Sequence, residues 1–295
     1  MSYNSLREIL FSMMILVYCL SLSYAAEPQA KEAAPANNKQ TNSYQAYEQL
    51  FDLYQPYLKN VKAYQPIYFL MGLNPEKSKF QFSFRYQLFN KEASLVDNND
   101  WLQGLNFAFT QTSFWDLEAT SKPFEDTSYK PELFFLSSNL TNGNGGLKGV
   151  FLQTGLQHES NGQGSDASRS TNILYLKPMF MFYNQDSLMG LQVAPKAWYY
   201  VANDDDNNQD LKDYRGYFEL GLKAGREDRL MVESHFRPAR EGNSWEFDLT
   251  YPIQKYFANN IGVYLHLQYV NSLAENMLNY EDRTEAVRLG VSLVR

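Results

Sequence analysis

Apolar and polar residues alternate along most of the chain. The clearest runs are Phe80–Leu88, Trp245–Ile253 and Ile261–Tyr269, where every second residue is apolar and the residues between are mostly polar. Successive side chains of a β-strand point to opposite faces, so this period of two predicts strands with one apolar and one polar face. We predict about twelve such strands, at residues 64–73, 78–90, 102–117, 129–141, 145–162, 168–184, 188–203, 211–225, 229–240, 243–254, 260–271 and 283–295.

Turn-forming residues separate these strands. Asn and Gly fill residues 142–146, Asn and Asp fill 203–210, and Glu241-Gly242-Asn243 separates two of the last strands. An even number of antiparallel strands closes readily into a membrane barrel. The expected fold class is therefore all-β, a twelve-stranded antiparallel transmembrane β-barrel over residues 61–295.

The composition favours a barrel over a helical membrane protein. Aromatic residues make up 16% of the 295 residues, yet the mean hydropathy is −0.47. Aromatics in a polar chain are typical of a barrel with an apolar outside and a polar inside. A soluble β-sandwich also alternates, but it rarely combines this aromatic content with an export signal and no cysteine in the mature chain. The net charge of −7 argues against a nucleic-acid partner.

Residues 1–25 have the features of a secretory signal peptide. Arg7 precedes an apolar run at 9–20, and Ser23-Tyr24-Ala25 provides a cleavage site. The run is too short to span a bilayer comfortably as a helix. The single cysteine, Cys19, lies inside this segment, so no disulfide is expected in the mature chain. Residues 26–60 are expected to form a flexible N-terminal segment, in which 43–58 could be an amphipathic helix or a plug.

Charged residues occupy the polar face of the predicted strands. They could pair across the lumen and fill it, or they could line a narrow pore, and the sequence leaves both open. These residues are Arg85, Glu219, Lys223, Glu246, Asp248 and Arg288.

Three polar residues interrupt the apolar face of two neighbouring strands. On the strand at 145–162, His158 and Ser160 are in phase with Val150, Leu152, Thr154 and Leu156. On the next strand, Asn172 is in phase with Leu174, Leu176, Phe180 and Phe182. If the apolar face contacts lipid, this places a hydroxyl, an imidazole and an amide on the outside of the barrel. That placement suggests an enzyme that acts on lipid.

These residue types match nucleophilic catalysis. A serine hydroxyl becomes nucleophilic when a base takes its proton, and histidine is the base suited to neutral pH. Asn172 can bond the other histidine nitrogen and hold the ring, as the third member of a triad does. A lone His-x-Ser is common by chance, so the shared outward face of His158, Ser160 and Asn172 carries the hypothesis.

The motif also resembles a known family. Residues Gly155-Leu156-Gln157-His158-Glu159-Ser160-Asn161-Gly162, followed by Ser168-Arg169-Ser170 and Asn172, resemble the outer membrane phospholipase A family. The likeness covers roughly residues 80–295 and includes further blocks at 109–115, 123–127, 131–134 and 198–207.

The resemblance implies an activity. It implies a calcium-dependent outer-membrane enzyme of a Gram-negative bacterium that hydrolyses sn-1 and sn-2 acyl ester bonds of phospholipids and lysophospholipids. Ser160 would be the nucleophile, His158 the general base and Asn172 the orienting residue. The active form would be a homodimer and the dormant form a monomer.

The same resemblance implies a metal site and a dimer contact. The calcium (Ca²⁺) ligands would be the carbonyl of Gln163, the hydroxyl of Ser168 and the hydroxyl of Ser121 from the second subunit. All of these are oxygens, as calcium requires. Asp206 matches a ligand of a second, monomer-type site, although a neighbouring acidic residue of the family is displaced to Asp166. Gln111 faces lipid and would bond across the dimer interface.

Blander alternatives remain at this stage. Ser121 and Ser168 could be ordinary loop serines, and Gln111 could lie near the lipid headgroups. The C-terminal Arg295 stands where insertion signals usually have an aromatic residue. A non-catalytic barrel, either a pore or a structural protein, is the rival from another class. An esterase for another acyl ester, such as lipopolysaccharide, would share the nucleophile.

Overall fold

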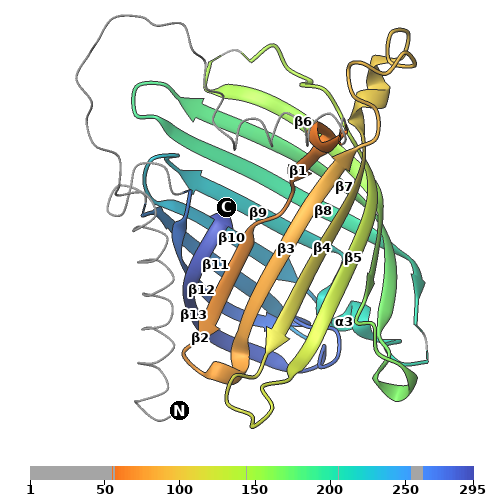
Figure 1. The fold of residues 1–295 in the computed structure, drawn as a ribbon, viewed down its shortest axis with the longest axis vertical. Helices are drawn as coiled ribbons and strands as arrows, with labels where there is room; N and C mark the ends of the chain where they lie inside the picture. Colours follow the sequence, from red (N-terminus) through yellow and green to blue (C-terminus); the bar gives the residue numbers. More distant parts are fainter. Residues whose placement is uncertain (1–54, 56, 144, 205, 254–261) are drawn as a thin grey trace, which may run out of the picture.

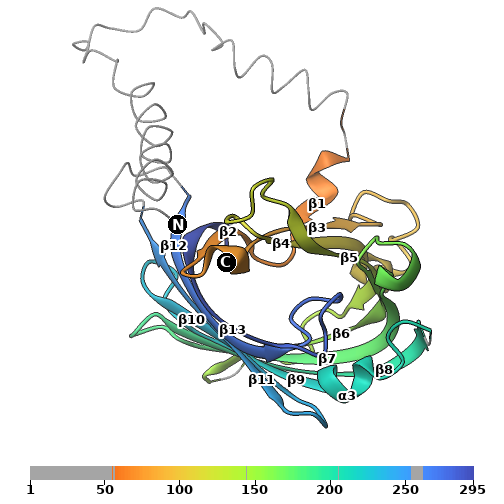
Figure 2. The same ribbon diagram turned by 90° about the horizontal axis from the view of Figure 1, so that it is seen from below.

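The chain forms an antiparallel β-barrel that closes on itself (Figures 1 and 2). The computed structural model describes residues 55, 57–143, 145–204, 206–253 and 262–295. Its strands are β1 (Val61–Ala63), β2 (Ile67–Gly72), β3 (Ser78–Gln87), β4 (Leu105–Trp115), β5 (Phe124–Leu136), β6 (Leu147–Ser160), β7 (Ser170–Asn184), β8 (Met189–Asn203), β9 (Phe218–Gly225), β10 (Met231–Pro238), β11 (Asn243–Pro252), β12 (Tyr264–Leu273) and β13 (Arg283–Val294).

Twelve strands close the barrel, as the sequence predicted. Strands β1 and β2 both pair with β3, so they are two pieces of one strand. Pro66 lies in the gap between them and has no N–H to donate to a ladder. Side chains of β3 bridge the gap instead: Gln81 donates to the Pro66 carbonyl, and Ser83 accepts from the Gln65 N–H. Pairing of β13 with β2 and of β3 with β4 then closes the sheet.

The helices are short. They are η1 (Leu58–Asn60), η2 (Pro75–Lys77), η3 (Asp100–Gly104), η4 (Ser165–Ala167) and α3 (Leu211–Arg215). Among the described residues, no helix has the length and apolar character needed to cross a bilayer.

Three strand ends lie five or more residues from their predicted positions. Strand β5 ends at Leu136 instead of 141. Strand β5 begins at Phe124 instead of 129, because the polar run Glu125 to Ser128 hides the alternation. Strand β9 begins at Phe218 instead of 211, because residues 211–215 form α3, with Leu211 buried in an apolar cluster. The predicted signal peptide at 1–25 and all but the end of the segment at 26–60 lie outside the described residues.

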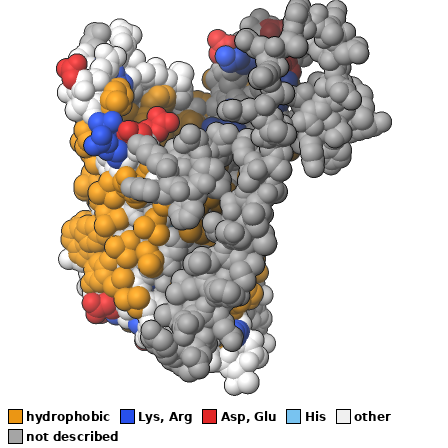
Figure 3. Space-filling view, turned by 60° about the vertical axis from the view of Figure 1, so that its left-hand side comes forward, with side chains coloured by type: hydrophobic (Ala, Val, Ile, Leu, Met, Phe, Trp, Pro, Cys, Tyr) orange, Lys and Arg blue, Asp and Glu red, His pale blue; other side chains and the backbone are white. Residues whose placement is uncertain are grey.

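Large apolar side chains cover the outside of the barrel. Figure 3 shows them as a continuous belt along one side of the wall. Leu156 is 54% exposed and Leu174 is 48% exposed, although both lie in the middle of the sheet. Hydrocarbon, not water, is the solvent that suits such a surface.

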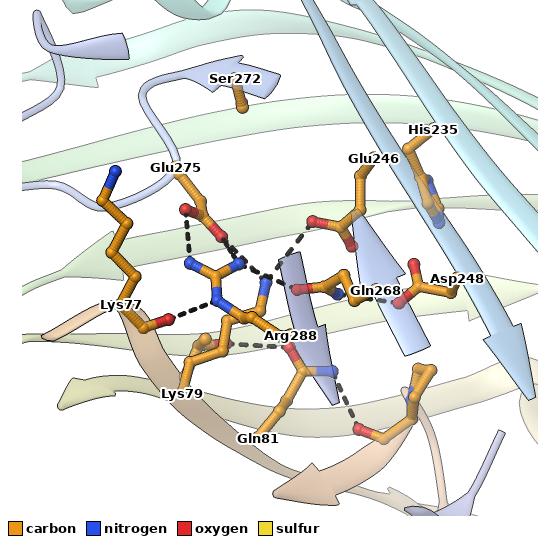
Figure 4. Close-up of polar contacts among 12 residues, drawn as sticks. Lys77, Lys79, Gln81, His235, Glu246, Asp248, Gln268, Ser272, Glu275 and Arg288 are labelled. Atoms are coloured by element: carbon orange, nitrogen blue, oxygen red, sulfur yellow. Dashed lines mark hydrogen bonds and ion pairs between the residues drawn. The ribbon is translucent and has the colours of Figure 1, made fainter. Parts of the chain in front are cut away.

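Ion pairs bridge the lumen from wall to wall (Figure 4). The Arg288 guanidinium lies 2.6 Å from the Glu275 carboxylate and 2.9 Å from the amide oxygen of Gln268. Lys79 lies 3.1 Å from Glu275, and His266 lies 2.6 Å from Asp248. A cavity of about 300 Å³ remains between these groups. The charged polar face therefore pairs with itself, as buried charges must to offset the loss of hydration.

One end of the barrel is covered by loops. We call it the triad end, because the predicted triad residues His158 and Ser160 lie where β6 ends there. The connections at this end are β2–β3, β4–β5, β6–β7, β8–β9, β10–β11 and β12–β13. The β12–β13 connection folds across the opening, where the Asp126 carboxylate accepts hydrogen bonds from the N–H groups of Met277 and Leu278, both at 2.9 Å (Figure 2). Leu211, Met277 and Tyr280 pack together above this contact. These contacts join the β12–β13 connection to β5 and to α3.

Candidate active site

His158, Ser160 and Asn172 all lie on the outer face of the barrel. On β6, Gln153 and Glu159 point inward and are buried, whereas Leu156 points outward. His158 and Ser160 are in phase with Leu156 and are partly exposed. On β7, Asn172 is in phase with the outward Leu174. The sheet therefore holds all three polar side chains against the space where lipid would lie.

The strand register brings the imidazole and the amide together. His158 and Asn172 are direct partners in the β6–β7 ladder. Asn172 Oδ1 lies 3.0 Å from His158 Nδ1. Because an amide oxygen only accepts, Nδ1 carries the proton in this contact, and Nε2 is left to act as a base. Ser160 follows two residues later on the same face, and among the described residues its hydroxyl makes no hydrogen bond.

A row of outward side chains crosses the sheet at Ser160. In the ladders, Ser160 is paired with Ser170 on one side and with Tyr129 on the other, and Tyr129 is paired with Gln111. The Gln111 amide donates to the Ser113 hydroxyl at 3.2 Å, so this outward amide has a partner within its own strand. The predicted dimer-contact residue thus lies two strands away from the predicted nucleophile.

The loop that follows Ser160 is fixed by one buried side chain. Asn161 donates from its amide to the Ala167 carbonyl at 2.8 Å and accepts from the N–H groups of Gln163 and Arg169. Gly162 adopts φ +68, and a Cβ there would come within 2.9 Å of the Tyr129 ring. Only glycine is suited to this position. Asn161 is part of the sequence motif, but no role was predicted for it, although its burial next to an outward serine follows from the alternation.

Comparison of the chain with known proteins shows the family to which it belongs. A family model described as Phospholipase A1 matches residues 7–293, which is almost the entire chain. The chain belongs to the phospholipase A1 family. It is 30% identical over 292 residues to Phospholipase A1 of Escherichia coli K12, covering 92% of both chains. It is 30% identical over 239 residues to Phospholipase A1 of Proteus vulgaris, covering 79% of this chain and 75% of that one.

Solved structures show the same fold. Outer membrane phospholipase A from Escherichia coli superposes with a TM-score of 0.65 at 24% identity, covering 80% of this chain and 98% of that one. A Salmonella typhi outer membrane phospholipase, described as a dimer with bound calcium, gives a TM-score of 0.63 at 23% identity over 80% of this chain and 92% of that one. The resemblance seen in the sequence is confirmed, as are the barrel fold, the ester hydrolase class and the outer-membrane location.

The phospholipase loop offers oxygen atoms for a cation. The Gln163 carbonyl and the Ser168 hydroxyl lie in the same short loop at the lipid-facing rim, and neither is used in a hydrogen bond among the described residues. Calcium takes six to eight oxygen ligands, including carbonyls, hydroxyls and water. The described residues contain no group of three or more His, Cys, Asp or Glu side chains placed to hold a metal. The loop thus offers two of the oxygens that a calcium site would need, and the rest would have to come from elsewhere.

The other two predicted ligands belong to other connections of the barrel. Ser121 is exposed in the β4–β5 connection, and no hydrogen bond joins it to the β6–β7 loop in the described chain. Asp206 is exposed in the β8–β9 connection, two residues before the buried Asn208. Asn208 binds both backbone groups of Ser170 at 3.1 Å. Ser121 was predicted to act from a second subunit and Asp206 in a separate site, and both stay predictions.

The structure adds an inward contact that the sequence did not suggest. Glu159, between His158 and Ser160, points into the lumen and lies 2.7 Å from Arg215 of α3. Burial opposes the charge on the Arg215 guanidinium, but the Glu159 carboxylate outweighs this and raises the pKa of Arg215. Both charges are retained because each offsets the other's loss of hydration.

Proposed function

We propose that this phospholipase hydrolyses acyl esters of phospholipids and lysophospholipids with Ser160 as nucleophile, His158 as general base and Asn172 as orienting residue. The 3.0 Å contact between His158 and Asn172 on the lipid-facing wall carries this proposal. A phospholipid acyl chain lying along the apolar belt would bring its ester to the height of Ser160.

His158 transfers protons in each step of the proposed ester hydrolysis. Ser160 Oγ attacks the acyl carbonyl carbon while its proton passes to Nε2 of His158. His158 then protonates the departing alcohol oxygen of the lipid, leaving the acyl group on Ser160. A water molecule gives a proton to His158 and attacks this ester. The bond between Ser160 Oγ and the acyl carbon then breaks, His158 returns the proton to Oγ, and the fatty acid leaves. Asn172 keeps the ring in the required tautomer throughout.

The developing negative charge needs donors beside Ser160. The N–H of Gly162 lies in the adjacent loop and makes no hydrogen bond among the described residues, so it is available as one donor. Calcium held by the Gln163 carbonyl and the Ser168 hydroxyl would supply positive charge next to that oxygen. The bound calcium described for the Salmonella typhi phospholipase supports the choice of metal.

Dimerisation would complete the site. Ser121 of a second subunit would add an oxygen to the half-site, and Gln111 would bond across the interface. Ser113 takes one donor of the Gln111 amide. Leaving the second N–H and the amide oxygen unpaired in hydrocarbon would be costly, which favours pairing between two copies. The relative described as a dimer supports this assembly. The monomer, with half a metal site, would be dormant.

Covalent trapping tests the proposal. A long-chain sulfonyl fluoride should label Ser160 in the presence of calcium and hardly at all in its absence, and the labelled protein should crosslink as a pair. Peptide mapping by mass spectrometry identifies the modified residue. Label on another serine, or no label with fatty acid release intact, would overturn the assignment.

A further inference from the structure

The β-ladder behind the triad has a gap. Strands β5 and β6 pair at Glu132–Gln157 and again at Tyr129–Ser160, but His158 and Glu159 have no partner on β5. Continuing the register places Pro131 opposite His158, and proline has no N–H to donate. The residue proposed as general base therefore sits where its strand is held by backbone pairing on one side only.

Side-chain bonds of Glu159 span this gap. Its carboxylate lies 2.6 Å from the Ser128 hydroxyl and 3.5 Å from the Lys130 ammonium, both on β5. Its other oxygen lies 2.7 Å from Arg215 of α3. The barrel uses the same device at Pro66, where Ser83 and Gln81 replace missing ladder bonds.

The β8–β9 connection forms hydrogen bonds with both strands that carry the proposed triad. Arg215 at its end binds Glu159 on β6 and also contacts the Met277 sulfur at 3.2 Å. Asn208 near its start is fully buried and bonds both backbone groups of Ser170 on β7. Ser170 is the ladder partner of Ser160. One connection thus restrains β6, which carries His158 and Ser160, and β7, which carries Asn172.

We propose that Glu159 and Arg215 are positioning residues for this reaction. Their ion pair, with the Ser128 hydrogen bond, fixes the backbone between His158 and Ser160 where the ladder to β5 is interrupted. Neither side chain touches the substrate, since both point into the lumen. The inference rests on the proposed roles of Ser160 and His158.

The expected effect on turnover follows from displacing His158, the proposed base, by a fraction of an ångström. Glu159→Gln keeps a hydrogen-bond acceptor for Ser128 and removes the charge that holds Arg215. Turnover per active site should fall roughly 10- to 100-fold, with KM unchanged, because misplacement of catalytic groups acts on kcat. The turnover of Arg215→Met should fall by a similar factor. Arg215→Lys should keep most of the turnover, because only one guanidinium nitrogen contacts Glu159.

The experiment counts active sites before it measures rate. Each variant is refolded in detergent, titrated with the sulfonyl fluoride in calcium, and assayed on phospholipid micelles. Glu275→Gln is the matched control, because Glu275 is equally buried and is paired with Arg288 at 2.6 Å, away from β6. It should unfold at a lower temperature while turnover per titrated site stays at the wild-type value. A merely structural role for Glu159 would give this same pattern.

The outcomes separate the two proposals. Wild-type turnover per site in Glu159→Gln and Arg215→Met, with an inactive Ser160→Ala, overturns only the positioning role. An active Ser160→Ala overturns the proposed function, and the positioning role with it. If Glu159→Gln does not fold, the difference between Arg215→Met and Arg215→Lys decides, and equal full turnover in both contradicts the inference.

Discussion

Asn172 and His158 face each other as ladder partners on neighbouring strands, with the amide oxygen 3.0 Å from Nδ1 of the imidazole. The contact is made on the lipid-facing side of the wall. A neutral amide suits this place better than a carboxylate, since a charge facing hydrocarbon is costly.

This contact predicts the effect of shortening Asn172. Asn172→Ala should leave Ser160 and His158 in place but free the imidazole to rotate, so kcat should fall roughly 10- to 100-fold with little change in KM. Fatty acid release from phospholipid micelles measures it. The matched control is Asn184→Ala at the far end of β7. Equal activity of the two variants would remove Asn172 from the mechanism.

Replacing the nucleophile should have a larger effect. Ser160→Ala removes the proposed nucleophile, and activity should fall by roughly a thousandfold or more. Ser170, its ladder partner on the same face, provides a control in the form of Ser170→Ala, because Asn208 contacts only its backbone. Both variants should show the heat-modifiable gel mobility of a folded barrel. If Ser170→Ala lost as much activity as Ser160→Ala, the loss would reflect removal of any outward hydroxyl in this part of the sheet and not removal of the nucleophile.

Two loop substitutions distinguish backbone from side-chain ligation. Ser168→Ala deletes a hydroxyl and should raise the calcium concentration for half-maximal activity roughly tenfold or more. Gln163→Ala keeps the carbonyl and should leave that concentration near the wild-type value. Chelation of calcium should abolish the activity of all variants, and addition of calcium should restore it. A chelated enzyme that remains active would contradict the metal requirement.

The dimer is predicted to depend on the outward amide of Gln111. Gln111→Leu suits lipid but cannot bond across an interface, so crosslinked dimer in calcium and activity should fall together. Ser113→Ala is the control, because it removes the hydroxyl that accepts from Gln111 and Thr127 but leaves the Gln111 amide in place. Dimer yield should not fall in Ser113→Ala. Undiminished crosslinking of Gln111→Leu would place the interface elsewhere.

Acid should remove one lumen contribution to stability. Burial alone would raise the pKa of Glu275, but Lys79 and Arg288 lower it to about 2. An unfolded glutamate titrates near about pH 4.3. The depressed value therefore stabilises the barrel above that pH, by about 1–3 kcal/mol, and this contribution is lost as the pH falls toward 2.

Thermal unfolding in detergent between pH 7 and pH 2 measures this. Glu275→Gln should be less stable than wild type at pH 7, and the gap should narrow as the pH falls. Glu92→Gln is the control, because Glu92 pairs with Lys59 in the exposed β3–β4 connection. A gap that stays constant with pH would show that the Glu275 charge is not what stabilises the lumen.

Much of the fold followed from local patterning. The period of two determined which residues face lipid, because neighbouring side chains of a strand must alternate. It therefore put Leu156, His158 and Ser160 on one face without any knowledge of register. Where the pattern was masked, the prediction was wrong: polar residues hid the start of β5, and a polar turn in α3 was read as strand.

Contacts between distant segments could not be predicted in this way. That Asn172 lies opposite His158, and not one position away, depends on the register of β6 and β7. That Arg215 reaches Glu159, or that Glu275 pairs with Lys79, depends on closure of the barrel.

The sequence by itself determined the strand faces, the outward placement of the hydroxyl, imidazole and amide, and the family. The tertiary structure decided which charges pair in the lumen and how Glu159 bridges the gap opposite Pro131. The physical reason is that alternation is a property of each strand alone, whereas pairing depends on distances that exist only once the sheet has closed.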